Sequence, residues 1–162
     1  MTSRQDFTDE EWARIRRAPL VAGVAISLAD PGGPIEVAKE SVASLRSATL
    51  PPSQEELLAS VALDVQALAQ QRKNPLGDFR PRGGQQVLEE LRGVNELVTA
   101  KATPEEVAAF RRWLVAAAQA AADAAKEGGF LGFGAEQVSA GEQQMLEQVR
   151  AALGVGSAAG QQ

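Results

Sequence analysis

Apolar side chains recur every three or four residues along most of the chain, the spacing that places them on one face of an α-helix. Six segments carry such a stripe. The stripes are Trp12 and Ile15; Ile35, Ala38, Val42 and Leu45; Leu57, Val61, Val65 and Leu68; Val87, Leu91, Val94 and Val98; Val107, Phe110, Leu114, Ala117, Ala121 and Ala125; and Leu146, Val149 and Leu153. Alternating runs of β-branched residues, typical of strands, are missing. The pattern predicts an all-α fold, a compact bundle of about six helices.

Four helix starts carry a capping box, in which Ser or Thr is followed three residues later by Glu and both side chains bond free backbone N–H groups. The boxes are Thr8–Glu11, Ser53–Glu56, Thr103–Glu106 and Ser139–Glu142. In the third box Pro104 takes the first helical position, where proline costs no hydrogen bond. The boxes predict the starts of the first, third, fifth and sixth helices.

Proline and glycine predict where several helices stop. Pro19 is expected to interrupt the first helix, because proline lacks the N–H that an inner turn needs. Residues 18–29 carry no charged side chain, so this half is expected to be buried on all sides. Gly128 and Gly129 are expected to close the fifth helix, and Gly154 the sixth. We therefore expect one helical domain over residues 1–154 and a flexible C-terminal tail over 155–162.

The first and fifth helices begin with similar sequences. Residues 8–17 and 103–112 share Thr, two Glu, Ala and two Arg at matching positions, and apolar residues match apolar residues. Each copy continues into an uncharged segment, a Gly-Gly pair and another helix. This pattern predicts two pseudo-repeated helix pairs, with the first and fifth helices at the centre; the alternative is two ordinary amphipathic helices that share a capping box.

Composition excludes several kinds of chemistry. The 162 residues contain no Cys, His or Tyr, so thiol nucleophiles, disulfides, Cys/His zinc sites and histidine acid–base catalysis are ruled out. A net charge of −5 disfavours nucleic acid as a partner. No run approaches the ~20 apolar residues of a membrane span. Residues 1–6 are polar and lack the apolar core of a secretory signal, so we expect a cytoplasmic protein, and we expect no cofactor.

One loop, Arg72 to Arg82, is strongly basic, with four cations and one acid around two prolines; we call it the basic loop. We expect Phe79 in it to be exposed. Phe79, Arg80 and Arg82 are candidates for docking an acidic partner, and the two arginines also for holding a phosphate. The alternative is a solvated loop whose cations complement the C-terminus of the third helix.

The repeated arginines and a glycine-rich connection are further candidates. If the repeat is real, Arg16 and Arg17 lie near Arg111 and Arg112 and bind an anion; the alternative is ion pairing at the surface, for instance with Glu11 or Glu105. Phe130 and Phe133 stand within the Gly-rich residues 128–134. They either plug the bundle from below or, if exposed, anchor a partner.

The C-terminal part resembles a known family. It runs from Ala124-Ala125-Lys126-Glu127-Gly128 through Val138-Ser139-Ala140-Gly141-Glu142 to Leu153-Gly154. This stretch is similar to the helix–loop–helix unit of TerB-like bacterial domains, small helical bundles linked to tellurite resistance and stress responses, some with metal-binding acids. The resemblance implies Glu127 and Glu142 as metal ligands. The chain departs from the family by Glu127 in place of Asp and by a longer, apolar loop, and two carboxylates alone make a weak site for a hard cation.

Taken together, these patterns favour a non-enzymatic helical protein that acts as a protein–protein interaction module, through a protein partner or self-association. Two alternatives stay open. The first is a TerB-like, stress-associated protein that binds a divalent cation or an anion. The second is a binder of small apolar ligands, with a pocket between alanine-lined helices.

Overall fold

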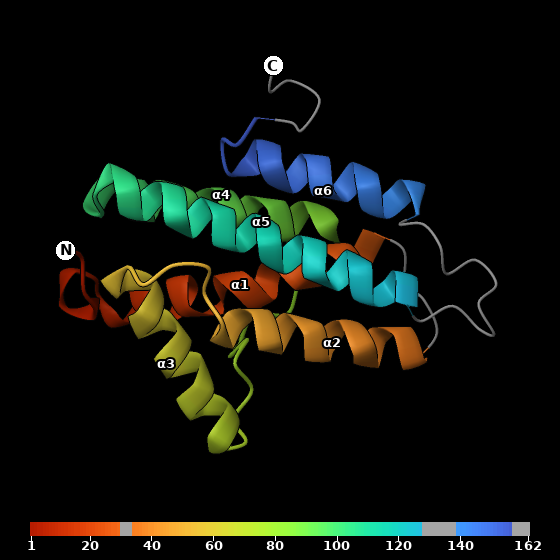
Figure 1. Cartoon of the computed structure of the whole chain (residues 1–162), viewed down its shortest axis with the longest axis horizontal. Coiled ribbons are helices and arrows are strands. Elements are labelled where there is room, and N and C mark those ends of the chain that lie inside the picture. The colour runs from red at the N-terminus through yellow and green to blue at the C-terminus, as the bar shows by residue number, and fades with distance from the viewer. Residues whose placement is uncertain (30–33, 128–138, 157–162) are drawn as a thin grey trace.

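The computed structural model describes residues 1–29, 34–127 and 139–156, and for 34–40 and 125–127 it describes the backbone alone. A short 3-10 helix, Arg4–Asp6, precedes six α-helices in the described residues: α1 (Asp9–Ala29), α2 (Pro34–Thr49), α3 (Glu56–Gln70), α4 (Gly84–Lys101), α5 (Pro104–Glu127) and α6 (Ala140–Ala152) (Figure 1). The described chain contains no strand. The expected all-α bundle is therefore confirmed. Within the described ranges, no helix combines the length and the apolar character that crossing a membrane requires.

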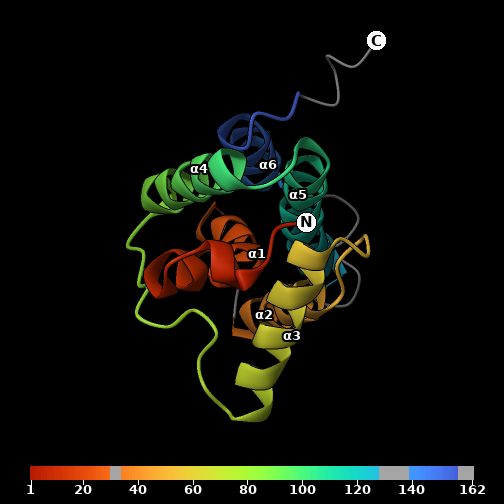
Figure 2. The ribbon, with the colours of Figure 1, turned by 90° about the vertical axis from the view of Figure 1, so that its left-hand side faces the viewer.

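Helices α1 and α5 form the centre of the bundle, as expected. They run in the same direction, and α2, α4 and α6 run the opposite way beside them (Figure 1). Each of the two central helices packs against all five other α-helices. Viewed along the bundle, α1 lies among α2, α4, α5 and α6, while α3 diverges from the others (Figure 2). Both α2 and α6 contact both central helices, as two equivalent pairs would; a duplication stays a prediction.

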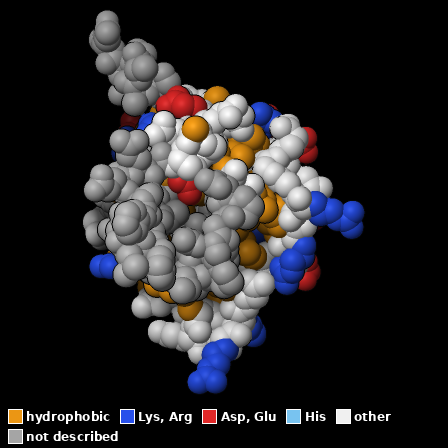
Figure 3. Space-filling model, turned by 90° about the vertical axis from the view of Figure 1, so that its right-hand side faces the viewer, with side chains coloured by type: hydrophobic (Ala, Val, Ile, Leu, Met, Phe, Trp, Pro, Cys, Tyr) orange, Lys and Arg blue, Asp and Glu red, His pale blue; other side chains and the backbone are white. Residues whose placement is uncertain are grey.

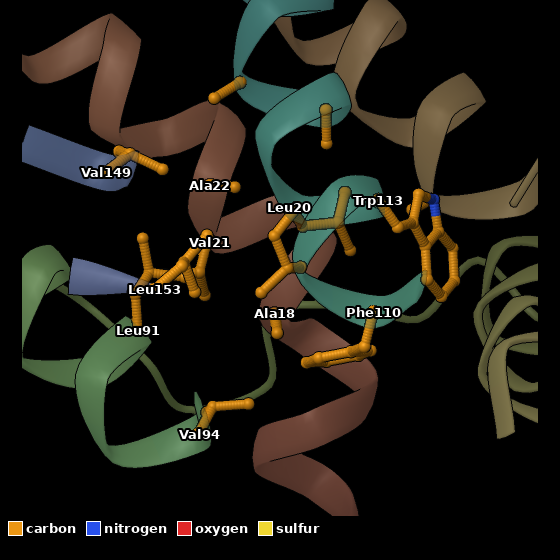
Figure 4. Packing of buried hydrophobic residues seen from close by; sticks show 14 of the residues in the cluster. Ala18, Leu20, Val21, Ala22, Leu91, Val94, Phe110, Trp113, Val149 and Leu153 are labelled. Atoms are coloured by element: carbon orange, nitrogen blue, oxygen red, sulfur yellow. The ribbon is translucent and has the colours of Figure 1, made fainter. Parts of the chain in front are cut away.

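The uncharged half of α1 contributes many of the core residues. Its side chains meet those of α4, α5 and α6 (Figure 4). Two tryptophans bind helix α3 and the end of α2 to this centre. The indole N–H of Trp12 donates to Asp64 Oδ2 over 2.7 Å, and that of Trp113 donates to the Ser47 carbonyl over 2.7 Å. A buried indole needs such a partner, so these bonds fix where α3 and α2 lie against the centre.

Pro19 does not interrupt the first helix, and that expectation is wrong. α1 continues from Asp9 to Ala29 with Pro19 inside it. Pro19 is buried, and the residues around it belong to the core, including the fully buried Ile15 and Val21. Most of a helix's stability in a protein comes from packing of its apolar face, and here that packing outweighs the missing backbone bond. The expectation that residues 18–29 are buried holds through Ile26, apart from a half-buried Val24.

Three of the four capping boxes form as expected. In each, the Thr or Ser hydroxyl accepts a hydrogen bond from the backbone N–H of Glu11, Glu106 or Glu142. The carboxylate of that glutamate accepts one from the backbone N–H of the Thr or Ser. The capping box predicted at Ser53 does not form, and that prediction is wrong. α3 begins at Glu56, and Glu55 takes the cap position without a side-chain bond. The fully buried Leu57 and Leu58 place the first turn of α3 by packing, and packing overrides a local cap signal.

Two helices are followed by a residue in the left-handed backbone conformation. Gly154 closes α6 at φ +69°, and the Val155 N–H then reaches the Arg150 carbonyl over 2.9 Å. Val155 is half-buried against the core, so the expected flexible tail does not include it; residues 157–162 lie outside the described residues. α3 ends in the same way, but there the left-handed residue is Arg72, at φ +56°.

Candidate functional site

The basic loop is mostly exposed, but Leu76 and Phe79 in it pack against the bundle. The Arg17 guanidinium lies 4.9 Å from the centre of the Phe79 ring, and Phe79 is half-buried against the core. Arg80 donates from Nη1 to the carbonyls of Gly77, over 2.7 Å, and of Phe79, over 3.1 Å. Phe79 is therefore not the exposed anchor expected from the sequence. Arg82 is exposed, and its role in docking stays a prediction.

The four repeated arginines do not meet at one site. Arg17 Nη2 lies 3.0 Å from Glu90 Oε1 on α4, a carboxylate that it shares with Arg14. Arg111 instead bonds Asn95 and Thr99, further along α4. Five residues of α-helix span about 7 Å, so these partners hold the two arginines apart.

Arg16 and Arg112, the other two arginines of the repeat, do not form the expected anion site either. Arg112 is exposed, and Arg16 is half-buried with its Nε unpaired. Glu11 bonds Lys101 rather than an arginine. The described structure therefore favours separate ion pairs and hydrogen bonds over a shared anion site.

The candidate metal ligands are also not brought together. Glu142 is buried, and its Oε2 accepts from the Ser139 backbone N–H at the start of α6 over 3.0 Å. The side chain of Glu127 lies outside the described residues, as do Phe130 and Phe133. Among the side chains that the structure describes, no group of three or more acidic residues could hold a metal ion. The structure explains Glu142 as a helix cap.

Two glutamates join the starts of α1 and α5, a feature that the sequence did not predict. Glu106 is buried and accepts from the backbone N–H of Thr2 over 2.8 Å and from the Thr2 hydroxyl. Burial raises the pKa of Glu106, but the bonds from Thr2 and Thr103 outweigh it and hold the pKa below its usual value. Glu11 accepts from Lys101 Nζ over 2.8 Å, and this bond, followed by the Thr8 backbone bond, lowers the pKa of Glu11.

These contacts cross between the two helices. The segment before α1 bonds the capping glutamate of α5, and the last residue of α4, just before α5, bonds the capping glutamate of α1. Both carboxylates thus hold the starts of α1 and α5 to neighbouring segments.

An apolar groove lies between α2 and α3; we call it the α2–α3 groove. α2 contributes Val42, Leu45, Arg46 and Thr49. α3 contributes Gln66, Ala69 and Gln70. The volume of the groove is about 520 Å³, and none of these seven residues is acidic.

Exposed apolar side chains mark the surface around the groove. Val42, expected in a buried stripe, is 69% exposed. Leu63 lies one turn before Gln66 on α3 and is 64% exposed. An exposed aliphatic side chain such as Val42 in an open apolar groove is the kind of surface that marks an interaction site.

A smaller pocket, the α1–α2 pocket, lies on the other side of Leu45. It is bounded by Leu20, Val24 and Ser27 of α1. Ser41, Ser44 and Leu45 of α2 and residues 74–76 of the basic loop complete it. Its volume is about 260 Å³. Seen from the end where α1 and α5 finish, hydrophobic side chains reach the surface with Lys and Arg side chains at their edge (Figure 3).

Comparisons with protein-family models, with curated proteins and with solved structures find no match to this chain. The resemblance of the C-terminal residues to TerB-like domains therefore stays a prediction. The sequence did not predict the α2–α3 groove, because Val42 fits the helical period of a buried stripe. A weak signal was present: Leu63 falls outside the stripe of its own helix.

Proposed function

We propose that this chain is a non-enzymatic interaction module that holds an acidic, amphipathic helix of a partner protein in the α2–α3 groove. The observation that carries the proposal is the α2–α3 groove itself, in which Val42 is 69% exposed and no acid stands among the lining residues that the structure describes. Soluble proteins rarely leave a contiguous apolar surface without using it for binding.

The charges around the groove favour an acidic partner. Arg46 is part of the lining, and Arg72 and Lys73, both exposed, follow directly after the end of α3. These cations stand out in a chain whose net charge is −5. Opposite charges on the two partners speed association and align the bound segment.

The shape of the groove favours a helix as the occupant. Val42 to Thr49 spans about 10 Å of α2, or about two helical turns. An amphipathic helix that lies between two others contacts them through residues spaced three, four and seven apart. Such a contact buries little area, so we expect weak, reversible binding rather than an obligate complex.

The chemistry inside the bundle supports a binding role rather than catalysis. Glu106 and Glu142, the buried carboxylates that the structure describes, both cap helices: Glu106 accepts from Thr2 and Thr103, and Glu142 accepts from the Ser139 backbone N–H. The indole N–H groups of Trp12 and Trp113 donate hydrogen bonds that join helices.

The proposal is tested with two synthetic peptides of about four helical turns. One carries Leu at positions i, i+4 and i+7 flanked by Glu, and the other replaces each Glu with Lys. Fluorescence anisotropy measures the dissociation constant of each. We expect the acidic peptide to bind with a dissociation constant of about 100 μM or tighter, and the basic peptide at least about tenfold more weakly.

Two matched variants locate the binding. Val42→Glu places a like charge in the groove and is expected to weaken the acidic peptide about tenfold or more. Leu50→Glu makes the same kind of change at a similarly exposed residue, 62% exposed, which does not line the groove, and is expected to bind normally. Equal affinity for both peptides, equal effects of both variants, or no saturable binding contradicts the proposal. Dimerisation that Val42→Glu abolishes, without peptide binding, assigns the groove to a second copy instead.

A further inference from the structure

The α1–α2 pocket differs from the α2–α3 groove in position and in chemistry. It lies between the second half of α1, the middle of α2 (Ser41, Ser44 and Leu45) and the turn at residues 74–76. No charged side chain stands among its described lining residues, whereas Arg46 lines the groove. Its walls are mainly aliphatic, from Leu20, Val24, Leu45 and Leu76. An inference about this pocket therefore does not rest on the proposed function.

Several polar residues around the pocket have partners within the protein. Ser27 and Ser41 each have an interaction partner. The Asn74 side-chain oxygen accepts from the Leu76 backbone N–H over 3.0 Å. A ligand therefore meets mainly hydrocarbon, together with the Ser44 hydroxyl, and a charged group finds no opposite charge among the described lining residues to offset its lost hydration.

The pocket is held open by rigid neighbours. α1 and α2 approach so closely at Gly23 that a Cβ there would lie 2.8 Å from the Cβ of Ser44. The turn that closes the third side is tied by the Leu76 bond to Asn74 and by a backbone bond from Gly77 to Asn74 over 3.0 Å. A preformed site binds without the cost of ordering its own walls.

The volume limits the size of the ligand. A dry, aliphatic cavity of about 150 Å³ holds one benzene molecule. The pocket is larger, at about 260 Å³, which suits one or two fused rings or an alkyl group of similar bulk. We infer that the α1–α2 pocket is a binding site for a small, uncharged apolar molecule, either aromatic or aliphatic.

Titration calorimetry with three probes tests this inference on the full chain. Naphthalene and 1-octanol represent the aromatic and the aliphatic ligand, and octanoate adds a negative charge to the same alkyl chain. We expect at least one neutral probe to bind with one-to-one stoichiometry, and octanoate to bind at least about tenfold more weakly than octanol, because none of the lining residues that the structure describes is a cation. Octanoate binding as tightly as octanol overturns the assignment to a neutral ligand.

Two variants place the binding in this pocket. Val24→Phe fills the space and is expected to weaken the neutral probes at least about tenfold. The matched control, Val115→Phe, enlarges another half-buried valine, on α5, that does not line the pocket, and is expected to leave affinity unchanged. If Val24→Phe does not fold, Leu76→Gln puts an amide in the wall on the loop side and is expected to have the same effect. Saturable binding that none of these lining variants changes, or no binding of either neutral probe, overturns the inference.

Binding to the pocket and docking in the groove are separable. Val42→Glu is expected to leave probe affinity intact, since Val42 lines only the groove. A loss of peptide docking with intact probe binding therefore contradicts the proposed function alone, and the reverse result contradicts the pocket alone.

Discussion

Exchanging the residue sizes where Gly23 of α1 meets Ser44 of α2 tests the packing beside the α1–α2 pocket. In Gly23→Ala, the added Cβ overlaps Ser44 Oγ and lies 2.8 Å from Ser44 Cβ. Rotating the buried Ser44 hydroxyl away removes only the first overlap. The second involves an atom fixed to the backbone of α2, so α1 and α2 must move apart by a few tenths of an ångström.

Two opposing terms set the size of the effect. Overpacking a core contact costs about 1–3 kcal/mol. Replacing glycine with alanine inside a helix favours folding by about 1 kcal/mol. We expect Gly23→Ala to lower the free energy of unfolding by about 1 kcal/mol, which is the overpacking cost less the gain in helix propensity.

Urea unfolding of a double-mutant cycle measures this contact. Ser44→Gly removes both overlapping atoms, so the double variant Gly23→Ala/Ser44→Gly should recover about 1–2 kcal/mol beyond the sum of the single effects. Gly93→Ala is the matched control. Its Cβ meets only the end of the flexible Arg14 side chain, so this variant should be neutral or slightly stabilised. A stabilised Gly23→Ala variant, or a coupling energy of about zero, would refute the packing described for α1 and α2.

Two further predictions concern the capping glutamate of α5 and the end of α3. Glu106→Gln should lower the free energy of unfolding at pH 7 by about 2 kcal/mol, because it weakens charge-assisted bonds to a buried group. Because the pKa of Glu106 in the folded protein lies below its usual value of 4.5, this stabilisation is present above pH 4.5 and is lost as pH falls through the folded pKa. The stabilities of variant and wild type in urea unfolding should therefore converge at acid pH. A stability difference independent of pH would contradict the role of the carboxylate. Arg72→Gly should raise the urea midpoint, by about 1 kcal/mol in stability, since glycine adopts the left-handed conformation without strain. Lys73→Gly, beside it without a positive φ, is the control and should not stabilise; an unchanged Arg72→Gly midpoint would count against strain at this position.

Much of the fold is encoded locally, and the exceptions show where packing decides. The boxes at Thr8, Thr103 and Ser139 form because each satisfies backbone groups within one turn. Ser53 carries the same signal and fails, because the start of α3 depends on burial of the leucines that follow it. Pro19 likewise breaks a local rule in a helix that the core holds in place.

The candidate sites were less predictable than the helices. Helical periodicity says that Val42 belongs to an apolar face, but it does not say whether another helix covers that face. α3 diverges from α2, which leaves Val42 open (Figure 1). Conversely, Phe79 was expected to be exposed, and it is half-buried: it packs against the core, and the guanidinium of Arg17, from a distant part of the sequence, lies over its ring. Such long-range pairings depend on the angles between helices, which sequence pattern alone does not specify.

The most direct measurement of the proposed docking site is a titration of isotope-labelled protein with the acidic peptide, followed by amide chemical shifts in nuclear magnetic resonance. The account predicts that the changes gather along the α2–α3 groove, at Val42, Leu45 and Arg46 on α2 and at Gln66, Ala69 and Gln70 on α3. Changes centred instead on Phe79 to Arg82, or no changes at saturating peptide, would contradict it.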